Sequence, residues 1–62
     1  MTLDKKLARL RKREGLSQAE VSEELDVSRQ AVTKWETGTS RPSIENLQSL
    51  SRLYNVPLEY LL

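Results

Sequence analysis

Residues 17–37 read SQAEVSEELDVSRQAVTKWET, and this stretch decides the fold. Ser17 and Glu20 have the spacing of a capping box, in which the serine hydroxyl and the glutamate carboxylate each satisfy an N–H group exposed at the start of a helix. Ser28 can cap a second short helix that ends near Gly38. Only two residues separate the two predicted helices. The sequence therefore predicts two helices that are joined by a tight turn and cross at a steep angle.

Helical patterns flank this pair on both sides. Residues 2–14 and 43–55 repeat apolar side chains at helical spacing, and Pro57 opens a short last turn. Thr2 and Ser43 are the expected N-caps. The apolar residues expected to line these two helices are Leu3, Leu7, Leu10, Ile44, Leu47, Leu50 and Leu53. No alternating apolar pattern of strand length occurs, so the predicted fold class is all-α with five short helices.

The composition excludes several classes of protein. Sixty-two residues leave room for one domain, spanning residues 1–62, and the chain has no cysteine and no histidine. These absences exclude a disulfide, a thiolate metal site and a histidine general base, so we expect no enzyme activity, no metal and no cofactor. No small-molecule ligand is indicated. No apolar run approaches the roughly 18 residues of a membrane span, and we predict a cytoplasmic protein.

The net charge of +1 hides an uneven distribution. Residues 1–14 hold six basic and two acidic side chains, whereas residues 15–27 hold four acidic side chains and no basic one. Residues 28–41 are basic again, with three basic side chains and one acidic. Two basic segments around an acidic one are compatible with a positive face that binds nucleic acid, although charge alone favours the alternative of ordinary solvated helix faces.

The second helix of the pair has a polar outward face. A helical wheel of about 100° per residue turns Val32 and Trp35 inward, so Trp35 is expected in the core rather than stacked on bases. The side chains turned outward are Gln30, Thr33, Lys34 and Thr37, with Arg29 at the edge. Arginine and lysine can bind the acceptors of guanine, and glutamine can bind adenine. Arg29 and Gln30 stand near the helix start, which enters the major groove deepest, so this face predicts contact with base edges.

Four segments together resemble one family of regulators. They are LSQAEV at 16–21, VSRQAV at 27–32, WETG at 35–38 and RPS at 41–43. In order and spacing they are similar to the helix-turn-helix regulators of the phage repressor and Cro type, the XRE family. The resemblance covers essentially the whole chain. It implies a compact five-helix, lambda-repressor-like DNA-binding domain whose helix-turn-helix occupies residues 17–37.

The chain departs from that family pattern at two positions. Ser22 stands where the family often has alanine, and serine is still small enough for a helix crossing. Asp26 stands where the family often has glycine. Aspartate is among the few other residues enriched at positive φ, so we expect the turn to survive both changes.

The resemblance also implies a role for individual residues. It places Ser28, Arg29, Gln30, Thr33 and Lys34 at base-reading positions. It assigns phosphate contacts to Arg11, Ser17, Gln18, Thr37, Thr39, Ser40 and Arg41, and a structural salt bridge to Arg11 and Glu36.

These observations favour a sequence-specific transcriptional regulator, expected to be a repressor, that binds double-stranded DNA with its third helix in the major groove. The alternative is a protein-interaction module on the same scaffold, such as an antitoxin-like or anti-regulator partner. Salt separates the two, because phosphate-driven binding weakens steeply as the salt concentration rises.

One such module contacts one half-site, so a homodimer on a near-palindromic operator is expected. The candidate interface is Leu58, Tyr60, Leu61 and Leu62, with part of the fourth helix. The alternative is that these four side chains seal the protein's own small core.

Overall fold

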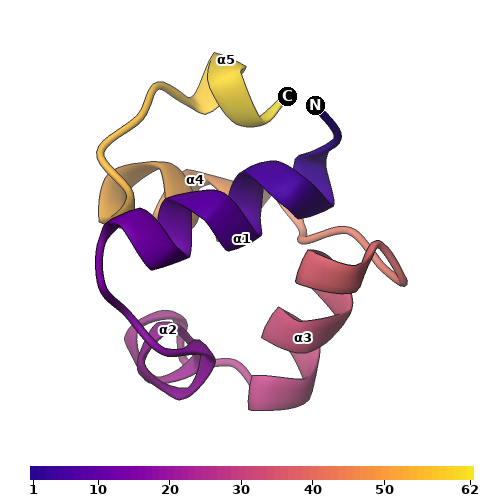
Figure 1. Ribbon diagram of the computed structural model, residues 1–62, viewed down its shortest axis with the longest axis vertical. Helices are drawn as coiled ribbons and strands as arrows, with labels where there is room; N and C mark the ends of the chain where they lie inside the picture. Colours follow the sequence, from indigo (N-terminus) through magenta and orange to yellow (C-terminus); the bar gives the residue numbers. More distant parts are fainter.

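The computed structural model describes all 62 residues and contains five helices and no strand. The helices are α1 (Leu3–Arg13), α2 (Gln18–Leu25), α3 (Arg29–Thr37), α4 (Ile44–Leu53) and α5 (Leu58–Leu61). In the view of Figure 1, α1 crosses the middle in front of α4, α2 and α3 lie below it, and the short α5 lies above. The predicted all-α class and the five helices are confirmed.

The starts of the helices follow the predicted caps, with one exception. Ser17 Oγ accepts a hydrogen bond from Glu20 N at 3.0 Å, and Glu20 Oε1 accepts one from Ser17 N at 2.8 Å, which completes the capping box. Ser28 and Ser43 accept in the same way from the N–H group three residues on, at 3.1 and 3.2 Å. Thr2 occupies the N-cap backbone position of α1, but its side chain makes no cap hydrogen bond, so that prediction is wrong for the side chain.

The turn between α2 and α3 has the conformation that the sequence predicts. Asp26 ends α2 with φ 56° and ψ 46°, in the left-handed region. Gly38 ends α3 with φ 79°. Asn55 follows the end of α4 with φ 56°. Aspartate and asparagine tolerate this region better than other side chains do, because their short polar groups can bind the local backbone.

The core joins all five helices. Its nine buried apolar residues are Leu7, Leu10, Val21, Val32, Trp35, Leu47, Leu50, Tyr54 and Leu61. Ile44 was expected beside Leu47 and Leu50, but it is 48% exposed, and that prediction is wrong. Residues three apart drift by about 60° around a helix, so a series spaced by three cannot stay on one face. At the other end of the series, Tyr54 stands four residues after Leu50 and is buried, whereas Leu53 is only half-buried.

The C-terminal residues divide between core and surface. Leu61 is 1% exposed and belongs to the core, which corrects its place in the expected dimer interface. Leu58 packs against the core and is half-buried. Tyr60 and Leu62 are 44% and 67% exposed. The alternative that this segment seals the core therefore holds for Leu61, whereas Tyr60 and Leu62 remain exposed on the surface.

Two basic side chains of α1 donate hydrogen bonds to backbone oxygens in the C-terminal part of the chain. Lys6 Nζ donates to the backbone oxygen of Tyr60 at 2.8 Å and lies 4.7 Å from the centre of the Tyr60 ring. Arg13 Nη2 donates to the backbone oxygen of Tyr54 at 2.7 Å. A helix of four residues has little stability of its own. We infer that packing of Leu61 and the Lys6 contacts keep α5 in place.

The predicted ion pair between Arg11 and Glu36 ties the end of α1 to the last turn of α3. Arg11 Nε and Nη2 donate to the two carboxylate oxygens of Glu36 at 2.8 and 3.0 Å. Arg11 Nη1 donates to the backbone oxygen of Leu16 at 2.9 Å. The two charged side chains are only 13% and 5% exposed. The hydrogen bonds to Glu36 raise the pKa of Arg11, although burial acts against that rise.

Glu36→Ala tests how much the fold depends on this pair. The substitution leaves the Arg11 guanidinium largely buried without its counter-charge, so we expect a loss of about 3 kcal/mol in the free energy of unfolding. Urea denaturation followed by circular dichroism measures it. The matched control is Glu23→Ala, which removes an exposed carboxylate with no ion pair and should change stability by less than about 0.5 kcal/mol. Equal stability of the two variants would contradict a structural role for the pair.

Candidate nucleic-acid interface

The outer face of α3 carries three long polar side chains that the fold does not use. Arg29, Gln30 and Lys34 are exposed, and none of the three side chains makes a hydrogen bond or an ion pair within the protein. Together with Thr33 they line a shallow hollow of about 420 Å³. The structure thus brings four of the five expected base-reading residues together on one surface.

The fifth expected base-reading residue, Ser28, lies at the N-cap of α3. It is exposed, and its hydroxyl oxygen accepts the hydrogen bond of Ala31 N at 3.1 Å. The hydroxyl proton of Ser28 remains free to donate, because capping uses the oxygen only as an acceptor. Ser28 directly precedes Arg29 but does not belong to the lining of the hollow.

The start of α2 contains two of the expected phosphate-binding residues. The side chain of Gln18 already makes two hydrogen bonds: its Nε2 donates to Glu36 Oε1 at 3.0 Å, and its Oε1 accepts from Thr33 Oγ1 at 2.9 Å, which leaves one N–H of Nε2 unused. The backbone N–H of Gln18 has no acceptor within the protein, as is usual in the first turn of a helix. Ser17 keeps its hydroxyl proton, because its oxygen serves only as an acceptor in the capping box.

These contacts form one polar chain through three helices. It runs from Arg11 on α1 to Glu36 on α3, then to Gln18 on α2, and back to Thr33 on α3. Arg11 uses three of its N–H donors inside the protein, and its guanidinium has further N–H groups available. The family resemblance implied the pair of Arg11 and Glu36, but the bonds of Gln18 depend on how α2 crosses α3 and had no local signal.

The end of α3 and the connection to α4 hold the other expected phosphate-binding residues, all of them exposed: Thr37 is the last residue of α3, and Thr39, Ser40 and Arg41 follow in the connection. The backbone N–H groups of Thr39 and Ser40 both donate to the Lys34 oxygen, at 2.9 and 3.3 Å. Thr37 Oγ1 lies 3.0 Å from the Thr33 oxygen and 3.1 Å from Thr39 Oγ1. Arg41 makes no ion pair. The backbone of this connection is thus held by hydrogen bonds to α3, and its one basic side chain, Arg41, is available to bind a phosphate.

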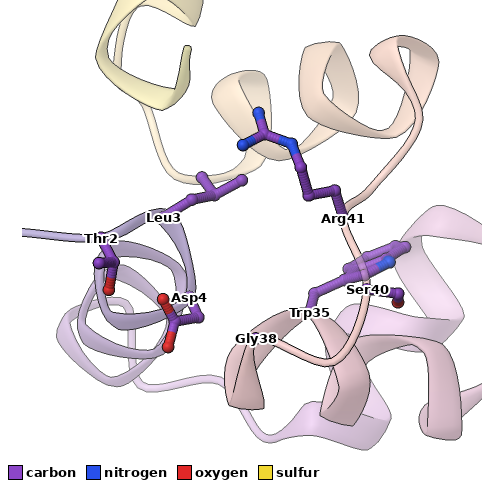
Figure 2. Close-up of a pocket in the computed structure, with 7 residues that line it drawn as sticks. All are labelled: Thr2, Leu3, Asp4, Trp35, Gly38, Ser40 and Arg41. Atoms are coloured by element: carbon purple, nitrogen blue, oxygen red, sulfur yellow. The ribbon is translucent and has the colours of Figure 1, made fainter.

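A cleft of about 300 Å³ separates this connection from the start of α1 (Figure 2). Its lining consists of Thr2, Leu3, Asp4, Trp35, Gly38, Ser40 and Arg41. Trp35 is buried against the core, which agrees with the structural role that the sequence indicated. A Cβ atom on Gly38 would stand 3.4 Å from Asp4 Oδ2, and the φ of 79° independently favours glycine here. The Thr2 side chain is the main cause that lowers the pKa of Asp4.

None of the five helices has both the length and the apolar character that crossing a membrane requires. The four carboxylates between residues 15 and 27 are all exposed, and no group of three potential metal ligands is found in the structure.

Comparison with known proteins identifies relatives along the whole chain. The HTH-type transcriptional activator BcrR of Enterococcus faecalis is 39% identical over 62 residues, which make up 100% of this chain and 30% of that protein. The HTH-type transcriptional regulator ImmR of Bacillus subtilis (strain 168) is 36% identical over 62 residues, or 100% of this chain and 49% of that protein. The chain therefore spans less than half the length of these curated relatives.

A solved structure agrees with the whole fold. The P22 c2 repressor protein, in a crystal structure with synthetic operator 9T, matches with a TM-score of 0.93 at 29% sequence identity, and the match covers 100% of this chain and 94% of that chain. This likeness confirms the predicted repressor-like arrangement of five helices. The helix-turn-helix family profile matches residues 7–61, and this chain belongs to that family.

Proposed function

We propose that this chain is the sequence-specific, double-stranded-DNA-binding part of a transcriptional regulator and places α3 in the major groove. The observation that carries the proposal is the exposed face of α3, where Arg29, Gln30 and Lys34 have no partner within the protein. Free side-chain donors of this kind match the acceptors of guanine and adenine. The P22 c2 repressor, similar over the whole chain, was crystallised with a synthetic operator.

Phosphate contacts on both sides of α3 would fix the register of the protein on the duplex. The backbone N–H of Gln18 and the Ser17 hydroxyl are free donors at the start of α2, where the helix dipole favours an anion. Arg41 and Ser40 offer free donors on the connection that follows α3. Such contacts set position, whereas base contacts set sequence preference.

Repression is the outcome that we propose, because a protein bound over a promoter blocks it without any chemistry, cofactor or metal. The relatives are named both as an activator and as regulators, so the regulatory outcome is a property to be tested in the whole protein. We propose that the protein is cytoplasmic and binds DNA there.

Arg29→Ala and Gln30→Ala test the base-reading face. Each removes hydrogen bonds to base edges, so we expect a loss of about 1–3 kcal/mol in binding to a duplex enriched from a random pool. Fluorescence anisotropy titrations at fixed salt measure it. The matched control is Arg52→Ala, an exposed arginine without an ion pair in the last turn of α4. Unchanged binding of both α3 variants would contradict the proposed function.

Arg41→Ala tests the phosphate contacts. The loss of one cation at the DNA backbone should weaken binding by a similar factor for specific and random duplexes. The slope of log K against log salt concentration should fall by about one unit for one lost phosphate contact. A variant that loses affinity only for the selected sequence would show that Arg41 contacts bases and not phosphates.

We propose further that two copies bind a near-palindromic operator through α5 and part of α4. Tyr60 and Leu62 are the large apolar side chains that remain exposed on the C-terminal segment. They lie next to Leu61, which is anchored in the core, so the backbone that presents them is fixed.

Leu62→Glu tests this interface. Because Leu62 is mostly exposed, the substitution should leave the melting temperature nearly unchanged, and a charge in a dimer contact should raise the dimer dissociation constant at least tenfold. Sedimentation equilibrium with and without operator duplex measures the dissociation constant. A wild-type chain that stays monomeric on a duplex with two half-sites would exclude the interface.

A further inference from the structure

Thr33 is the one residue of the α3 hollow whose polar atom already has partners. Its Oγ1 donates to Gln18 Oε1 at 2.9 Å and lies 3.2 Å from the backbone oxygen of Arg29. Both partners are acceptors, so the single hydroxyl proton of Thr33 is used inside the protein. Gln18 Oε1 cannot rotate away freely, because Nε2 of the same carboxamide is bound to Glu36 at 3.0 Å.

Because its hydroxyl proton is used within the protein, Thr33 cannot donate a hydrogen bond to a base pair. It has no proton left for the acceptors of guanine, adenine or thymine in the major groove. The hydroxyl is directed to α2 and to the preceding turn of α3, and the second substituent on the same carbon is a methyl group. The methyl group is therefore the part of Thr33 that can line the hollow.

The neighbours of Thr33 make that hollow suitable for an apolar group. Arg29 and Gln30 stand four and three residues before Thr33, on the same side of the helix, and Lys34 follows it. All three have aliphatic stems that end in a polar group, and such stems cover apolar surface while their ends reach outward. Thymine is the one base that presents a methyl group in the major groove.

From this arrangement we propose that Thr33 recognises the 5-methyl group of a thymine by apolar contact, and that it donates no hydrogen bond to a base. The inference rests on the proposed function and gives it a base preference at one position of the site. Arg29, Gln30 and Lys34 then supply the hydrogen bonds to the neighbouring base pairs.

The test compares thymine with deoxyuridine, which keeps the hydrogen-bonding edge and lacks the methyl group. A duplex enriched by the wild-type chain from a random pool is resynthesised with each thymine replaced singly by deoxyuridine. At one position we expect binding to weaken about fourfold, the value of one buried methyl-sized group. No sensitive position at all would overturn the proposal.

Two variants assign the sensitive position to Thr33. Thr33→Ser keeps the hydroxyl that holds Gln18 and removes the methyl, so thymine and deoxyuridine at that position should bind equally well. Thr33→Val removes the hydroxyl and keeps a methyl, so the preference for thymine should persist even if the melting temperature falls. A Thr33→Ser variant that still prefers thymine there by fourfold would overturn the proposal.

The outcomes separate this inference from the proposed function. A wild-type chain that enriches no sequence from the random pool fails at DNA recognition, and both proposals fall. A chain that enriches a duplex but whose thymine preference is the same in wild type and Thr33→Ser binds DNA as proposed and does not read a methyl group through Thr33.

Discussion

The pair of Arg11 and Glu36 is the contact on which the geometry of the interface depends. A domain of this size has a small core, here nine buried apolar residues, and such a core supplies little net stability on its own. One guanidinium binds both the last turn of α3 and the backbone before α2, and the same carboxylate holds Gln18. Breaking this pair would leave a largely buried charge, so the arrangement of α1, α2 and α3 is fixed as one unit.

The part of the fold that depends on neighbouring residues could be predicted from the sequence. The capping box of Ser17 and the cap at Ser28 follow from groups within three residues of one another, whereas the left-handed turn at Asp26 followed from the family pattern, in which glycine often stands there. The exposed position of Arg29 and Gln30 follows from helical periodicity once Val32 and Trp35 are inside. The roles of these residues toward DNA are not tested by the fold and stay predictions.

What could not be predicted depends on contacts between distant segments. Nothing in the sequence near Gln18 indicates that Glu36 and Thr33 occupy both ends of its carboxamide. Helix α5 is a single turn that ends at Leu61, so periodicity is too short to separate the buried Leu61 from the exposed Leu62 that follows it. The difference arises from packing against the core and from Lys6 across the chain.

Some polar side chains of the candidate interface are held by hydrogen bonds within the protein and others are free, and this difference affects how selectively the domain can bind DNA. The groups nearest the helix crossing, Gln18 and Thr33, are ordered before DNA arrives and lose little freedom on binding. Arg29 and Lys34 are unrestrained, and ordering each of them costs about 0.5–1.5 kcal/mol. Nonspecific phosphate contacts offset part of that cost for any duplex. Only a base pair with matching acceptors offsets the remainder, so selectivity at Arg29 and Lys34 rests on hydrogen bonds that exceed the cost of ordering these two side chains.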